Sequence, residues 1–307
     1  MQRRLGRDWQ LQFRMAFTMM LLAFVYLIFG VVLYRAGAGF VTIAVLVGGL
    51  ALAQYYFSDR LVLATTGARL VDDQTLPEVQ DILGRLSALA DLPKPRLAVI
   101  QSQMPNAFAT GRDPRHAVVA VTTGLVRALP EPELEAVLGH ELTHVRNRDV
   151  AVMAMASFFS TIAAWLAQSL LFMGAGFGGG FGGGRRRGGD SLGVVLLVSW
   201  LVYLVSFLLI MALSRYREYA ADRGSAVLTG HPANLASALM RISGTMERIP
   251  TRDLRQAAPH NALFILPAAV GRENVMELFH THPNLQHRLA RLRRLELDLA
   301  GAGTHRR

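Results

Sequence analysis

The 307-residue sequence contains no cysteine. Disulfides, cysteine-ligated zinc ribbons and thiol-based catalysis are therefore all excluded. Any metal ion in this protein has to be held by histidine, aspartate or glutamate. Lysine is nearly absent as well, since Lys94 is the only one, and arginine supplies almost all of the positive charge.

Acidic residues are outnumbered: 32 Lys and Arg face 22 Asp and Glu, which gives a net charge of +10. Such a balance suits anionic lipid headgroups or nucleic acid. No ribonucleoprotein, zinc-finger or helix-turn-helix pattern accompanies the charge, so we expect no nucleic-acid partner. The alternative interpretation is a set of positive loops that orient a membrane protein.

Long hydrophobic runs are abundant: hydrophobic residues make up 52% of the chain, and its mean hydropathy is +0.30. A bilayer span needs about 20 apolar residues. The sequence predicts four transmembrane helices and a lipid bilayer as partner, in the uncharged stretches Met15–Tyr34, Ala36–Ser58, Val150–Met173 and Ser191–Ser214.

The first stretch has an alternative interpretation as a secretory signal peptide, because arginines precede it and Ala36-Gly37-Ala38 resembles a cleavage site. The hydrophobic region of a signal peptide is usually about 7–15 residues long, and here a second apolar run follows at once. A retained helical hairpin is therefore the better prediction.

The positive-inside rule sets the orientation. Arginines 3, 4, 7 and 14 place the N-terminus in the cytoplasm, and two pairs of spans return both charged segments to that side. Arg185–Arg187, in the glycine-rich segment 174–190, would lie outside and run against the rule. The expected domains are a hairpin (1–58), the first half of a catalytic domain (59–149), a second transmembrane pair (150–214) and the second half (215–307).

The charged segments combine helices with a small sheet. Apolar spacing predicts a helix over "LPEVQDILGRLSAL", and "RLAVIQ" and "HAVVAV", the latter starting at His116, are typical of short strands. "EPELEAVLGHELTHVRNRD" begins with acids and a proline, which favour a helix start. Pro232–Ile249 and Pro283–Leu299 are predicted to be amphipathic helices. The fold class is a mainly α membrane protein with a small sheet.

The stretch "GHELTHVRNRD" carries the chemistry. On a helix His140 and His144 lie one turn apart on the same face, so both imidazoles can reach one ion. Glu141 follows the first histidine and lies beside the ion, where a general base can take a proton from an attacking water. A chance match on a solvated helix is the alternative. The pattern predicts a catalytic Zn²⁺ site.

A catalytic zinc ion usually has three protein ligands. The metzincin pattern, in which a third histidine binds the metal, would need Gly at 147 and His at 150, but the chain has Asn147 and Val150. "SRYREYAADRGSA" offers Glu218 as a ligand, with Asp222 one turn later to accept a hydrogen bond from a ligand histidine. A solvated charge cluster is the alternative, since arginines flank both acids.

The order of these segments, followed by "THPNLQHR", resembles the HtpX family of integral membrane zinc metalloproteases, which is related to the CAAX prenyl proteases. The resemblance extends from the first span to about Arg294. It implies a zincin-like α+β catalytic domain, Glu218 as the third zinc ligand, Asp222 as the partner of a ligand histidine and Glu141 as the base. It also implies protein quality control, in connection with stress.

Two further segments suggest substrate contacts. "PNAFATG" contains Asn106, and in the resembling family it lies at the edge of the active-site sheet, where substrate backbone can add as a strand. A plain turn is the alternative. In "THPNLQHR", His282 or Arg288 could stabilise the oxyanion, and the start of a helix is the alternative.

The sequence thus predicts a zinc endopeptidase in a prokaryotic inner membrane, multi-pass, with its catalytic domain in the cytoplasm and with polypeptides, above all membrane proteins, as substrates. One alternative is a peptidase of narrow specificity like the CAAX proteases. Another is a non-catalytic membrane scaffold with a structural metal, which would be closed by four protein ligands. The oligomeric state is not set by the sequence.

Overall fold

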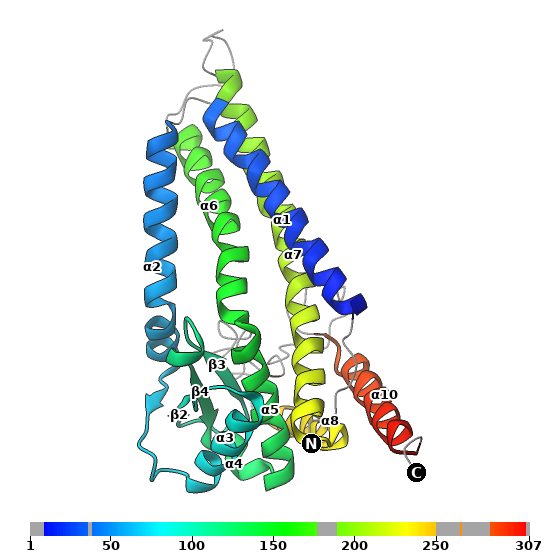
Figure 1. Cartoon of the computed structure of the whole chain (residues 1–307). Helices are drawn as coiled ribbons and strands as arrows, with labels where there is room; N and C mark the ends of the chain where they lie inside the picture. Colours follow the sequence, from blue (N-terminus) through cyan, green and yellow to red (C-terminus); the bar gives the residue numbers. More distant parts are fainter. Residues whose placement is uncertain (1–8, 36–38, 177–188, 250–264, 266–282, 305–307) are drawn as a thin grey trace.

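A computed structural model describes residues 9–35, 39–176, 189–249, 265 and 283–304 (Figure 1). Long helices rise from one side of a smaller domain that contains the sheet. The long helices are α1 (Trp9–Arg35), α2 (Phe40–Thr66), α6 (Asp149–Gly176) and α7 (Gly189–Thr229).

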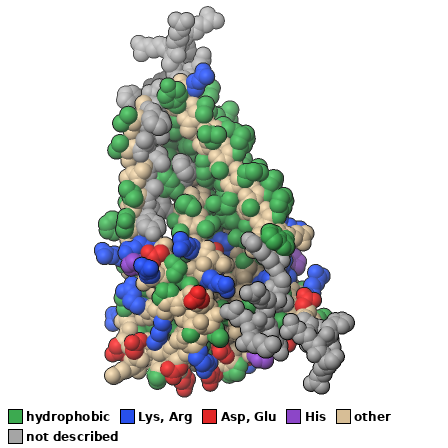
Figure 2. All heavy atoms as spheres, in the orientation of Figure 1, with side chains coloured by type: hydrophobic (Ala, Val, Ile, Leu, Met, Phe, Trp, Pro, Cys, Tyr) green, Lys and Arg blue, Asp and Glu red, His purple; other side chains and the backbone are tan. Residues whose placement is uncertain are grey.

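Three helices among the described residues are long and apolar enough to cross a membrane: Trp9–Arg35, Asp149–Gln168 and Gly193–Thr229. Figure 2 shows hydrophobic side chains over the long helices, whereas charged side chains gather on the smaller domain. Large apolar side chains such as Phe13 and Leu197 are each 70% exposed. Such a surface is costly in water and suits a lipid environment.

Polar contacts and small side chains join the long helices. The Tyr26 hydroxyl of α1 donates to the Ala156 carbonyl of α6, and Ser199 and Ser206 of α7 are fully buried. Small residues and interhelical hydrogen bonds of this kind replace the hydrophobic effect as the basis of packing in lipid.

The smaller domain contains a four-stranded mixed sheet, with strand order β1-β2-β4-β3. The predicted strands are found as β2 (Arg96–Ile100) and β4 (Val118–Thr122), which pair in parallel. Two short strands were not predicted: β1 (Arg69–Leu70) and β3 (Ala107–Thr110), each antiparallel to its neighbour. β3 is an end strand of this sheet, at the edge that the family resemblance implies.

His116 does not begin the β4 strand, contrary to the prediction. It ends the short 3-10 helix η1 (Pro114–His116), where the Asp113 side chain accepts hydrogen bonds from the Arg115 and His116 backbone N–H groups. An aspartate that caps backbone donors in this way favours a turn over a strand.

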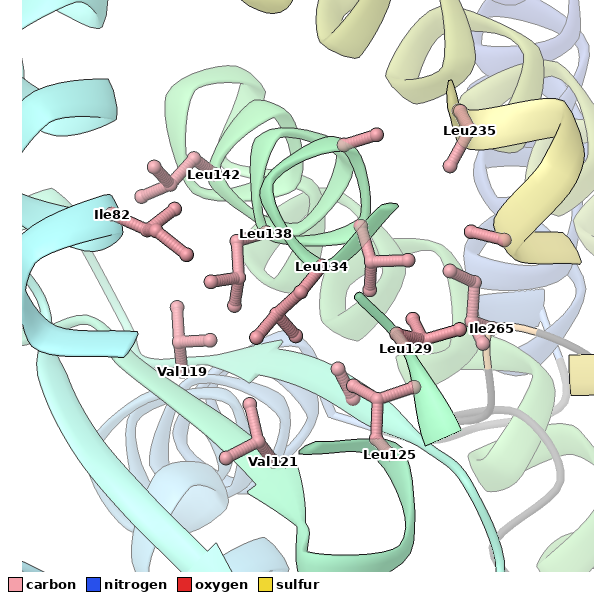
Figure 3. Packing of buried hydrophobic residues seen from close by; sticks show 14 of the residues in the cluster. Ile82, Val119, Val121, Leu125, Leu129, Leu134, Leu138, Leu142, Leu235 and Ile265 are labelled. Atoms are coloured by element: carbon pink, nitrogen blue, oxygen red, sulfur yellow. The ribbon is translucent and has the colours of Figure 1, made fainter. Parts of the chain in front are cut away.

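The core lies between the sheet and helices α3 (Pro77–Ala90), α5 (Glu131–Asn147) and α8 (Pro232–Met246). Figure 3 shows Leu138 of α5 pointing between Ile82 of α3 and Val119 of β4, with Leu142 and Leu134 on either side of it along the helix. The apolar spacing of four residues places one face of α5 in the core. The short helix α4 (Thr123–Ala128) follows directly after β4, and the Thr122 hydroxyl caps it by accepting from the Leu125 N–H.

The C-terminal helices agree with the sequence pattern: α8 matches the predicted helix 232–249, and α10 (Leu285–Thr304) matches 283–299. The long helix α7 differs from expectation, because it continues without a break beyond Ser214 to Thr229. The membrane segment and the segment with Glu218 are therefore one rigid helix.

Candidate metal centre

Helix α5 carries the two histidines. Pro132 and two glutamates in its first turn favour its start, since the free N–H groups there lie at the positive end of the helix dipole. The helix ends at Asn147, and the next residue, Arg148, adopts a left-handed conformation with φ of 56°. α6 begins at the next residue, so the metal centre lies directly below the membrane helices.

Helix α7 crosses α5 and brings Glu218 to the histidines. One ligand atom each from His140, His144 and Glu218 lies within 4.8 Å of the others, and all three residues are buried. His140 and His144 turn their Nε2 atoms toward one another at 3.2 Å. Each Nε2 also lies 3.5 Å from one oxygen of the Glu218 carboxylate.

These distances fit a zinc ion. A tetrahedral ion with bonds of about 2.0–2.1 Å places its ligand atoms about 3.3 Å apart. The two Nε2 atoms are 3.2 Å apart, each lies 3.5 Å from a different oxygen of Glu218, and one ligand atom from each residue lies within 4.8 Å of the others. Two imidazoles and one carboxylate are also the donor set of many catalytic zinc sites. The arrangement therefore fits a three-ligand zinc ion with a fourth position for water or substrate.

Asp222 lies behind His140, where the sequence predicted a partner for a ligand histidine. Its Oδ1 is 3.1 Å from His140 Nδ1. Arg288, which is fully buried, donates two hydrogen bonds of 2.9 and 2.6 Å to the same carboxylate. A third bond joins Arg288 to the Ile265 carbonyl. Its guanidinium is therefore hydrogen-bonded behind the metal ligands. This contact is an alternative to the predicted role of Arg288 in stabilising the oxyanion.

Asp149 is a neighbour of the site that the sequence interpretation missed. It is the first residue of α6, and its Oδ2 lies 2.6 Å from His144 Nδ1. Asp149 is the last residue of "GHELTHVRNRD". The sequence does not predict the left-handed conformation of Arg148, which turns Asp149 back toward His144.

Electrostatics in the metal-free site favour a positive charge. Burial lowers the pKa of the His140 imidazole, but hydrogen bonds to Asp222 and Glu218 outweigh burial and raise the pKa from 6.5 to about 9. A divalent cation would replace that proton in the same field.

Glu141 is 3% exposed, and burial raises the pKa of its carboxyl group. His140, His144 and a backbone hydrogen bond from Ala109 of β3 oppose the rise. A carboxylate with a raised pKa is better matched to proton transfer near neutral pH. Glu141 thus lies between the histidines and the end strand of the sheet.

The remaining predicted residues are placed differently. Asn106 is buried, and its side-chain oxygen accepts a hydrogen bond from the Ile265 N–H. Its backbone exchanges hydrogen bonds with Thr122, which anchors the start of β3. A substrate contact by Asn106 remains a prediction. His282 lies outside the described residues.

The fold and the site define a class: a membrane-bound zinc metalloprotease. The peptidase family M48 model matches residues 73–296, and the chain belongs to that family. A protease HtpX homolog of Moorella thermoacetica is 57% identical over 97% of this chain and 99% of its own length. Protease HtpX homolog 2 of Methanosarcina acetivorans is 52% identical over 98% of this chain and 100% of its own length. These relatives confirm the family resemblance predicted from the sequence.

Among solved structures, the crystal structure of S. mikatae Ste24p resembles this chain with a TM-score of 0.51 at 17% identity. The match covers 93% of this chain and 66% of that one. At this identity the likeness concerns the fold alone.

Proposed function

We propose that this metalloprotease is an endopeptidase in which His140, His144 and Glu218 hold Zn²⁺ and Glu141 acts as the general base. The observation that carries the proposal is the buried group of three ligand atoms with a fourth acid, Glu141, beside them. A structural zinc ion has no use for a buried acid at that position, and it usually has four protein ligands. Among the described residues, only these three form such a group.

In the proposed reaction, Glu141 takes a proton from the attacking water and delivers it to the leaving amine. Bound zinc would supply Lewis acidity, which promotes the attack and stabilises charge on the carbonyl oxygen. Asp222 keeps His140 oriented through Nδ1, so that Nε2 faces the ion.

The substrate is expected to bind extended along β3. This strand ends the sheet, and its Ala109 N–H already reaches Glu141. A recess beside His144, lined in part by Thr110 of β3 and by Arg148, continues from the end of the strand. An added strand would place its backbone within reach of the base and the ion.

The catalytic domain is proposed to lie at the cytoplasmic face of a prokaryotic inner membrane, with α2 as the fourth span. α2 has 27 residues and covers most of an uncharged stretch, and the arginine-rich N-terminus favours this orientation. The site lies where α6 begins, which suits damaged or misassembled membrane proteins as substrates in quality control. Profiling membrane proteins in cells that carry Glu141→Gln tests this role, and an unchanged profile would count against it.

A paired assay tests the catalytic proposal. Wild type and Glu141→Gln are purified in detergent, stripped with a chelator, reloaded with zinc and followed for cleavage of casein and of themselves. We expect cleavage by wild type alone, restored by zinc, and equal zinc content in both proteins. Equal cleavage by both proteins would contradict the role of Glu141. Zinc binding without cleavage by either would favour the narrow-specificity peptidase or the scaffold.

A further inference from the structure

Asp149 contacts a zinc ligand from an unusual direction. It follows His144 by five residues, and on an unbroken helix two such residues would point about 140° apart. The left-handed turn at Arg148 breaks the helix between them, with its N–H bonded to the Val145 carbonyl at 3.1 Å. The first residue of α6 therefore faces back onto the last turn of α5.

The contact is short and buried. Asp149 is 1% exposed, and its Oδ2 lies 2.6 Å from His144 Nδ1. The opposite ring nitrogen of His144 faces His140 and Glu218. A buried carboxylate at Nδ1 favours the tautomer that has its proton there, which leaves Nε2 as the metal-binding atom.

Arg217 of α7 balances the charge of Asp149. Its Nε lies 3.3 Å from Asp149 Oδ2, and the arginine side chain is 13% exposed. The arrangement repeats the one behind His140, where Arg288 holds Asp222. Behind each of the two histidines thus lies a carboxylate, and each carboxylate contacts an arginine.

We propose that Asp149 is a positioning residue for the metal centre: it fixes the tautomer and ring orientation of His144, and Arg217 holds Asp149 in place. The inference rests on the proposed zinc ligation by His140, His144 and Glu218. It also ties the centre to the membrane helices, because Asp149 starts α6 while Arg217 and Glu218 lie side by side in the sequence of α7.

The test measures zinc affinity rather than proteolysis. The full chain in detergent is titrated with zinc against a competing chromophoric chelator, as wild type, Asp149→Ala and Asp149→Asn. We expect the alanine variant to bind zinc about 10–100-fold more weakly, as is usual when such an outer partner is removed. The asparagine variant should lose less, since its amide oxygen can still accept from Nδ1–H.

Asp113→Asn is the matched control. Asp113 makes the same kind of contact with a histidine, 2.9 Å from His116 Nδ1, but His116 is exposed and is not one of the three grouped ligands. Its zinc Kd should equal that of wild type. Cobalt substitution adds a spectroscopic signal: the visible absorption bands should change in Asp149→Ala and stay the same in Asp113→Asn.

A purely structural role for Asp149 would lower the melting temperature of the metal-free protein and leave zinc Kd and the cobalt spectrum unchanged. That result would overturn the inference. If the alanine variant does not fold, the asparagine variant provides the test. A zinc Kd for Asp149→Asn equal to that of wild type would then overturn the inference. Failure of wild type itself to bind zinc would overturn the proposed function along with the inference, whereas wild-type binding by all variants would overturn the inference alone.

Discussion

Gly224 of α7 faces Thr143 of α5 so closely that a methyl group at position 224 would lie 2.3 Å from the threonine hydroxyl oxygen. The next residue, Ser225, donates a 2.6 Å hydrogen bond to the Ala136 carbonyl of α5. Because α5 carries the histidines and α7 carries Glu218, this close crossing sets the distance between the metal ligands.

Gly224→Ala should therefore separate the two helices and weaken zinc binding. Overpacking of this kind costs about 1–3 kcal/mol of folding stability. Chelator competition and thermal unfolding measure the two effects. Gly244→Ala is the control, since nothing lies within 4 Å of a Cβ added there. In that helix the control should gain about 0.5–1 kcal/mol. Unchanged zinc affinity in Gly224→Ala would show that the crossing does not set the ligand geometry.

Glu218→Gln should abolish stoichiometric zinc binding under conditions that saturate wild type. The amide lacks the negative charge that faces both imidazoles, whose Nε2 atoms lie 3.5 Å from the carboxylate oxygens. Metal analysis after gel filtration measures the content. Glu247→Gln, at the exposed end of α8, should retain one zinc ion. Full zinc content in Glu218→Gln would remove it from the ligand set.

Zinc affinity should rise with pH between 7 and 9. The metal-free site holds a proton on His140, whose pKa is raised to about 9, and zinc has to displace it. Below that pKa, this group alone contributes up to about a tenfold gain in apparent affinity per pH unit, and the gain ends above it. Titrations in chelator-buffered zinc at several pH values measure the slope. A flat profile above pH 7 would mean that His140 keeps its ordinary pKa.

Arg288→Met should destabilise the whole fold rather than affect turnover alone. It removes the only guanidinium that the structure describes on Asp222 and deprives that buried carboxylate of two charge-assisted hydrogen bonds. Loss of one member of a buried pair costs about 3–5 kcal/mol. Arg293→Met, on the exposed side of the same helix, should stay within about 0.5 kcal/mol of wild type. A stable Arg288→Met protein with low turnover would favour the oxyanion role instead.

The sequence predicted the parts of the fold that have a strong period. The apolar spacing of α3, α5 and α8 and the long uncharged stretches appear directly in the letters. The strand β3 has only four residues, too few for a period, and it follows Asn106, which is also typical of a turn. The continuity of α7 across Ser214 was hidden because the composition changes from apolar to charged there, although the helix does not end.

At the site, His140, Glu141 and His144 could be predicted because one turn of helix brings them together. Glu218 lies 74 residues beyond His144 in the chain (218 minus 144), so its position depended on the order of motifs in a family. Asp149 was missed because its contact depends on one left-handed residue, Arg148, that no composition rule favours over a continued helix.

X-ray absorption at the zinc edge of the zinc-loaded full chain tests the central claim most directly. We expect one zinc ion with two imidazole nitrogens at about 2.0–2.1 Å and the remaining positions filled by oxygen from Glu218 and from solvent. Four protein ligands, or more than two imidazoles, would contradict a catalytic centre made of His140, His144 and Glu218.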